Sequence, residues 1–87
     1  MTLAWIICGA GRGVGKTHLA ETLERILPRA VRAKLGRGKR KAAGRGNFFT
    51  EEKPLLEFIK AGRGTFLHVI VEANAPAVRG AGDVVVY

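Results

Sequence analysis

The residues with the clearest chemistry form a glycine-rich segment, residues 10–17, that ends in Gly-Lys-Thr. The apolar run Leu3–Cys8 precedes it and predicts a buried strand that delivers the chain to the loop. Glycines let successive backbone N–H groups turn inward around a phosphate group. The Lys16 ammonium can then neutralise the outer phosphates of a nucleotide, and the Thr17 hydroxyl can ligate Mg²⁺. The spacing is that of a phosphate-binding loop (P-loop), and it predicts binding of ATP or GTP as the Mg²⁺ complex.

The predicted nucleotide contacts run from the loop into the first turn of the helix that follows it. They are Ala10, Gly11, Arg12, Gly13, Val14, Gly15, Lys16, Thr17 and His18. Ala10 stands where the usual pattern begins with Gly, and Arg12 is predicted either to contact a phosphate or to face solvent. The helix directs the positive end of its dipole at the same phosphates, while the His18 side chain is expected to be exposed. The alternative is a glycine-rich turn with no ligand.

Glu72 is the acid predicted to complete the site. It ends the apolar strand predicted at residues 66–71, and ligands gather at the carboxyl ends of strands in open α/β sheets. We expect Thr17 and Glu72 to hold Mg²⁺; the alternative is a solvated carboxylate. Lys34 ends another predicted strand at the same edge. Lys16 and Lys34 are the predicted catalytic residues, with Lys34 reaching the transferred phosphoryl group or an anionic second substrate. The alternative for Lys34 is a solvated charge.

Apolar periodicity predicts the elements that position these residues. Four segments predict strands, at residues 3–8, 30–35, 66–71 and 83–87. A helix is predicted after the loop, with an apolar face formed by Leu19, Ala20, Leu23, Ile26 and Leu27. A second helix is predicted to begin between Thr50 and Pro54 and to end at Gly62. Residues 36–49 are predicted to be a mobile basic loop, and residues 73–82 a further loop.

This order of elements predicts one α/β domain spanning residues 1–87. We expect a three-layer sandwich of the P-loop NTPase type, with a small, mostly parallel sheet of about four strands and right-handed crossovers. Sheets of that type generally have more strands. We therefore expect either a truncated chain, in which the C-terminal part of the usual fold is absent, or a shortened domain that another chain completes.

The charge of the chain is concentrated in one segment. The net charge is +8, and the segment from Arg29 to Arg45 contains basic residues but no acid. The basic residues are Arg29, Arg32, Lys34, Arg37, Lys39, Arg40, Lys41 and Arg45. A block of this kind attracts polyanions, so the predicted partner of residues 29–45 is a nucleic acid or an anionic small molecule.

The remaining residues indicate the setting of the protein. Cys8 is the single cysteine and is predicted to be a core residue, which suits a reducing compartment. No basic leader precedes the first strand, and no segment approaches the ~20 apolar residues that a membrane span needs, so we expect a cytoplasmic protein with no membrane partner. His68 is predicted to be a satisfied core histidine. Asp83 begins its strand and is predicted to be structural, at the opposite edge of the sheet.

The P-loop, the strand end at Lys34 and the segment Val-Glu-Ala-Asn around Glu72 together resemble a known group. The group contains the P-loop proteins related to the molybdopterin-guanine dinucleotide biosynthesis accessory protein (MobB-like), in the dimerising division of P-loop GTPases and ATPases. The Asp-Val-Val-Val segment at residues 83–86 is part of the resemblance. It implies an accessory role in molybdenum cofactor biosynthesis and a homodimer. Many relatives carry an additional lysine in the loop, and this chain has Gly11 at that position. The chain also contains no Asn-Lys-x-Asp segment, the motif that would favour GTP over ATP.

Three functions follow from these observations. The leading hypothesis is a nucleotide-binding protein with weak NTPase or phosphoryl-transfer activity, in which no residue is identified as a general base. The first alternative is a small basic module that binds nucleic acid, although only Phe48 and Phe49 lie near the basic block to stack on bases. The second alternative is an inactive P-loop fragment.

Overall fold

The computed structural model describes residues 1–8, 16–36, 47–73 and 75–86. In this part of the chain, five parallel strands form one sheet in the order β3-β2-β4-β1-β5. The strands are β1 (Leu3–Ile7), β2 (Ala30–Leu35), β3 (Asn47–Phe49), β4 (His68–Glu72) and β5 (Val84–Val86). The helices are α1 (Lys16–Ile26), α2 (Glu52–Gly62) and α3 (Pro76–Gly80).

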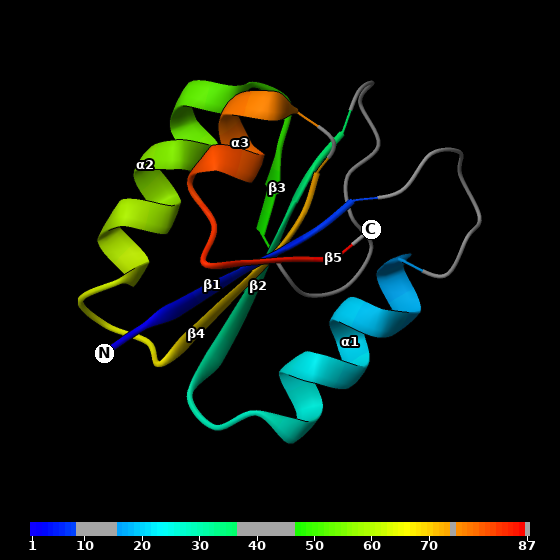
Figure 1. Cartoon of the computed structure of the whole chain (residues 1–87), viewed down its shortest axis with the longest axis vertical. Helices are drawn as coiled ribbons and strands as arrows, with labels where there is room; N and C mark the ends of the chain where they lie inside the picture. The colour runs from blue at the N-terminus through cyan, green and yellow to red at the C-terminus, as the bar shows by residue number, and fades with distance from the viewer. Residues whose placement is uncertain (9–15, 37–46, 74, 87) are drawn as a thin grey trace.

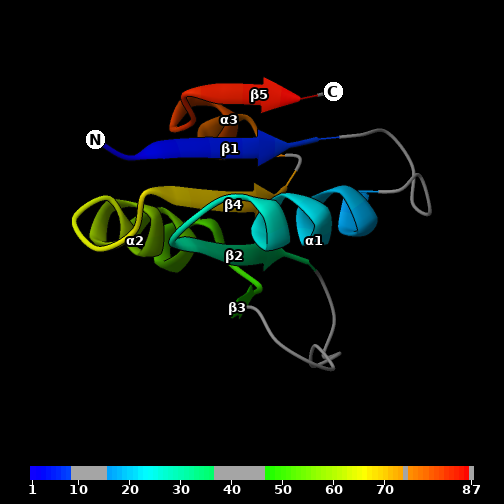
Figure 2. The ribbon, with the colours of Figure 1, turned by 90° about the horizontal axis from the view of Figure 1, so that it is seen from below.

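The helices cover both faces of the sheet, so the described residues form three layers (Figure 1). Helix α1 lies against β2 and β4 on one face, and α2 and α3 pack together on the other. Figure 2 shows the strands side by side and pointing the same way, with α1 in front of β4 and β2. Helix α1 connects β1 to β2, which lies closer to the β3 side of the sheet. Helices α2 and α3 connect β3 to β4 and β4 to β5, in the opposite direction across the sheet. Crossovers of a single hand therefore require these helices to lie on opposite faces.

Each face of the sheet has its own apolar core. The α2 and α3 face has the larger one, which includes Ile6, Val69 and Val71 from the strands and Leu55 and Ile59 from α2. The α1 face has a smaller core around Ile7, Ala20 and Ile70. Alternation along the strands explains the division, because neighbouring residues of a strand point to opposite faces.

The structure confirms a small α/β domain with a parallel sheet, but the prediction of about four strands was too low. Asn47–Phe49 forms the extra strand, β3, inside the segment predicted to be a loop. Three residues are too few to show an alternating pattern. They are held by tertiary contacts instead, since the rings of Phe49 and Phe58 pack with their centroids 5.4 Å apart.

Two other details of the sequence prediction were wrong. Residues 76–80 form the short helix α3, which lies inside the predicted loop 73–82 and has a Pro in its first turn and Val78 fully buried. Ile26 was predicted to lie on the apolar face of α1, yet it is 63% exposed. Successive helical residues are about 100° apart, so Ile26 lies at the margin of the apolar stripe, farthest from the buried Ala20.

Helix α2 begins at Glu52, with Glu51 as its N-cap, which is within the range predicted for its start. Cys8 is 5% exposed and belongs to the core of the α2 face, as predicted. None of the helices in the described ranges is long and apolar enough to cross a membrane.

Candidate functional site at the carboxyl edge of the sheet

The carboxyl ends of the strands meet at one edge of the sheet. Lys34 of β2 is in register with Phe48 of β3 on one side and with Glu72 of β4 on the other. Glu72 is in turn in register with Ile7 of β1, and Ile7 with Val86 of β5. One row of residues therefore crosses all five strands at this edge. We call these five residues the edge row.

The edge row lies on the face that carries α1. Ile7 and Val86 belong to the core beneath α1, and Glu72 lies on the same face as Ile70, two residues before it. Lys34 likewise shares a face with Arg32, whose guanidinium Nε donates to the Glu24 carboxylate of α1 at 3.0 Å. Helix α1 begins at Lys16, so its amino end follows the segment that leaves β1 at this edge.

Glu72 is buried and held in place on both sides. It is 2% exposed and is the charged residue that lies in the core of the described part of the chain. The sheet continues beyond it, because Ala73 N–H donates to Ile7 O at 3.1 Å and Cys8 N–H donates to Val86 O at 2.7 Å. The burial contradicts the alternative of a solvated carboxylate at a strand end. The backbone of Glu72 therefore lies one strand away from the end of β1, about 4.8 Å in a parallel sheet.

Oxygen donors at this place suit Mg²⁺. Magnesium prefers oxygen ligands and commonly takes one or two from the protein, with water and substrate phosphates supplying the rest. Glu72 offers a carboxylate at the end of β4, and the backbone of Thr17, whose side chain lies outside the described part, belongs to the first turn of α1. Within the described residues, no group of three His, Cys, Asp or Glu side chains could hold a metal by itself. The buried Glu72 carboxylate therefore fits a metal ion that takes its remaining ligands from water or from a bound phosphate.

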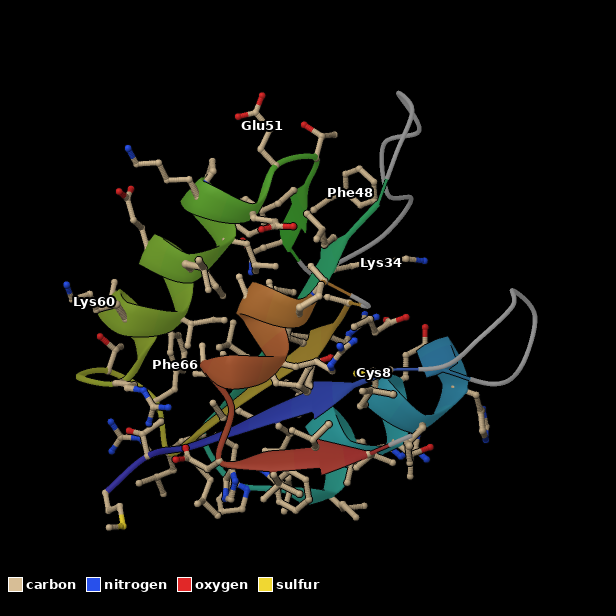
Figure 3. The ribbon with its side chains drawn as sticks, turned by 45° about the horizontal axis from the view of Figure 1, so that its top comes forward. Cys8, Lys34, Phe48, Glu51, Lys60 and Phe66 are labelled. Atoms are coloured by element: carbon tan, nitrogen blue, oxygen red, sulfur yellow. The ribbon has the colours of Figure 1, made fainter. Side chains whose placement is uncertain are left out.

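Lys34 is exposed, in contrast to its neighbour Glu72. Its side chain runs out past the end of β2, away from the core (Figure 3). Among the described residues, the ion pairs of 4.0 Å or less do not include Lys34. Exposure is compatible both with a contact to an anionic ligand and with a solvated charge.

Two other residues of the basic block, Arg29 and Arg32, form hydrogen bonds or ion pairs within the protein. Arg29 Nη2 donates to Thr65 O at 3.1 Å, and it lies before β2, at the opposite edge from Lys34. Arg32 lies between the carboxylates of Glu24 and Glu21, at 3.0 Å and 3.9 Å. The three described members of the predicted block, Arg29, Arg32 and Lys34, are thus spread along β2 and have different surroundings. Its other members, Arg37, Lys39, Arg40, Lys41 and Arg45, lie outside the described residues.

Much of the predicted nucleotide site also lies outside the described residues. This applies to Ala10, Gly11, Arg12, Gly13, Val14 and Gly15, to the side chains of Lys16 and Thr17, and to Asn74. His18, in the first turn of α1, is exposed as expected.

His68 and Asp83 lie at the opposite, amino edge of the sheet. Trp5 Nε1 donates to His68 Nδ1 at 3.1 Å, which satisfies the half-buried histidine. The Asp83 carboxylate accepts from Ala4 N–H at 2.8 Å and pairs with the Arg63 guanidinium at 3.1 Å. The Ala4 N–H and, less strongly, Arg63 lower the pKa of Asp83. Asp83 is structural, as the sequence predicted, and His68 is hydrogen-bonded as predicted but lies half-buried at the start of β4 and not in the core.

Phe48 is the residue of the edge row that sequence reasoning did not connect with the site. The only available indication was the pair of aromatic residues directly after the glycine-rich basic segment. Its half-buried ring becomes a neighbour of Lys34 only because β3 pairs with β2. No family model, curated protein or solved structure was found to match this chain.

Proposed function

We propose that this domain binds a nucleoside triphosphate, ATP or GTP, as its Mg²⁺ complex at the carboxyl edge of the sheet. The observation that carries the proposal is the burial of Glu72, 2% exposed and in register with the last residue of β1. The segment between β1 and α1 has the sequence pattern of a P-loop. Among the described residues Glu72 is the buried charged side chain, and it lies beside that segment, where a carboxylate can reach a metal ion bound together with the phosphates.

Different residues bind the phosphates and the Mg²⁺ ion of the proposed ligand. The backbone N–H groups of residues 10–15 and the amino end of α1 surround the phosphates, and the Lys16 ammonium neutralises their charge. Thr17 and Glu72 would hold Mg²⁺ through oxygen atoms. When bound, Mg²⁺ supplies positive charge that polarises the phosphate oxygens. Lys34 lies on the same face, one strand beyond Glu72, and contacts the transferred phosphoryl group or the second substrate.

The chemistry that suits this arrangement is weak NTPase or phosphoryl-transfer activity. Phosphoryl transfer depends mainly on positioning and on neutralising charge, so a site with few reactive side chains can support it. The resemblance to MobB-like proteins would place this activity in an accessory step of molybdenum cofactor biosynthesis.

The described basic residues give the nucleic-acid alternative less support than the nucleotide site. A protein that follows a phosphate backbone needs several cations along one surface. Arg29 and Lys34 lie at opposite edges of the sheet, and Arg32 is paired with two carboxylates of α1.

The test is titration of Mg-ATP and Mg-GTP into the protein by isothermal calorimetry, with Lys16→Ala as the test variant. Lys60→Ala is the matched control, because Lys60 is an exposed lysine on α2. We expect at least a tenfold loss of affinity for Lys16→Ala and none for Lys60→Ala, because one charge-assisted contact contributes about 1.5–3 kcal/mol. Equal, negligible binding by wild type and Lys16→Ala would overturn the proposal.

A further inference from the structure

An aromatic ring and a cationic side chain stand next to each other at the end of the edge row. Phe48 and Lys34 are register neighbours on the same face, about 4.8 Å apart at the backbone. Lys34 is exposed and Phe48 is half-buried, so both present surface to the solvent. Helix α1 packs on β2 and β4, and α2 is the helix that contacts β3.

The Phe48 ring packs against the backbone at Gly36. Gly36 follows β2, and its N–H donates to Phe49 O at 2.9 Å. A Cβ atom at Gly36 would lie 3.0 Å from two carbons of the Phe48 ring, so the ring packs directly over this glycine. Asn47 Nδ2 also donates to Arg32 O at 3.1 Å, which ties the start of β3 to β2. These contacts hold the ring at a defined position beside Lys34.

The pair lies beside the nucleotide site and not within it. Two strands, β2 and β4, separate β3 from β1, which sets Phe48 about 14 Å from the strand that leads into the P-loop. Lys34 lies between the ring and Glu72. A small ligand held by Phe48 and Lys34 would therefore approach the Mg²⁺-nucleotide from the β3 side.

We propose that Phe48 and Lys34 form the binding site of the second substrate, a small anion that carries a planar aromatic group. This inference rests on the nucleotide-binding function proposed above. The ring stacks on Phe48, because aromatic faces attract each other in offset or tilted contacts. The negative group pairs with the Lys34 ammonium. The specificity comes from Phe48, whereas Lys34 binds any small anion.

The experiment compares phenyl phosphate with methyl phosphate, which have the same charged group and differ in the ring. Binding of each is followed by NMR titration of the ¹⁵N-labelled protein, with and without a non-hydrolysable Mg-ATP analogue. We expect wild type to bind phenyl phosphate roughly tenfold more tightly than methyl phosphate. This ratio corresponds to the lower end of the free energies that aromatic stacking contributes.

The variants separate the two roles. Phe48→Leu should abolish the preference for phenyl phosphate, while Lys34→Gln should weaken both ligands and retain the preference. Phe66→Leu and Lys60→Gln are the matched controls, since Phe66 is a half-buried ring just before β4, at the opposite edge of the sheet, and Lys60 is an exposed lysine on α2. Both controls should behave as wild type, and the amide spectra report whether each variant is folded.

The outcomes distinguish this inference from the proposed function. If the nucleotide analogue binds but wild type shows no preference, or Phe48→Leu keeps it, the inference is wrong and nucleotide binding stands. If the preference depends on Phe48 while no nucleotide binds, the aromatic site stands and the proposed function fails.

Discussion

At the scale of single residues, the edge row places side chains of different chemistry next to one another. Glu72 is buried and Lys34 is exposed, although the two are register neighbours on adjacent strands. The difference arises from position, because β4 lies in the middle of the sheet, between β2 and β1, while β2 is next to the edge strand β3. The central position suits a fixed metal ligand, and the outer one suits contact with an incoming molecule.

Glu72→Gln tests the metal role of this carboxylate. The amide keeps the size of the side chain but loses the negative charge that attracts Mg²⁺. We expect the gain in nucleotide affinity on adding Mg²⁺ to fall by about tenfold or more, the range found when groups that support a metal are removed. Calorimetric titration of ATP with Mg²⁺ and with EDTA measures it.

The exposed Glu57 of α2 supplies the control, as Glu57→Gln, and should leave the effect of Mg²⁺ unchanged. An undiminished effect of Mg²⁺ in Glu72→Gln would remove Glu72 from the metal site.

At the scale of elements, α3 and β5 are joined where the chain passes closest to another strand. The Cβ position of Gly82 meets the side chain of Ile6, which is fully buried in β1. Asp83 N–H then donates to Ala4 O at 2.8 Å as β5 begins to pair with β1. A glycine is required here by close approach, since the backbone conformation of Gly82 is not a left-handed one.

Gly82→Ala should therefore destabilise the protein by about 1–3 kcal/mol, the usual cost of overpacking a core. Gly80→Ala is the internal comparison, because nothing lies within 4 Å of its Cβ position. That change should be neutral or stabilise the fold by about 0.4–1 kcal/mol, since it reduces the entropy of the unfolded chain. Urea unfolding measures both, and equal effects of the two variants would contradict this account of Gly82.

At the scale of the whole molecule, Arg63 joins three segments at the amino edge. Its guanidinium donates to Thr2 O before β1 and to Ala81 O after α3, and it pairs with Asp83 at the start of β5. The Thr2 hydroxyl oxygen lies 2.7 Å from Arg63 O and 2.6 Å from Phe66 O, so its single hydrogen is donated to this pair of carbonyl groups. These bonds lie at the edge opposite the candidate site and tie the starts of β1 and β5 to the turn after α2.

The pH dependence of the free energy of unfolding should reveal the contribution of the Asp83 interactions at this edge. The Ala4 N–H and Arg63 lower the pKa of Asp83 below its ordinary value of 3.8, so the folded state binds this proton less readily than the unfolded state. The stabilisation is therefore complete above that value and is lost as the pH falls below it. Urea midpoints at pH 7 and pH 3 measure the effect.

Asp83→Asn should lower the midpoint at pH 7 and make the fall toward pH 3 shallower than in wild type. Glu57→Gln should leave the fall unchanged. An identical fall in wild type and Asp83→Asn would show that Asp83 does not contribute.

The local sequence determined the elements whose pattern is long enough to read. The apolar runs produced β1, β2 and β4, the helical spacing produced α1 and α2, and Glu72 was recognised because an acid follows a buried strand. The role of Asp83 also followed from its place at the start of a strand. Short-range patterns suffice here because helices and strands each have their own repeat along the chain.

Only the tertiary structure decided the order of the strands and which residues lie next to each strand end. β3 and α3 have three and five residues, too few to show a period, and each is stabilised by contacts with distant residues such as Phe58 and Leu55. The pairing of β3 with β2 brings Phe48 beside Lys34, and the position of β4 between β2 and β1 buries Glu72. These neighbours come from different parts of the chain, so no local pattern specifies them, and burial is a property of the assembled sheet.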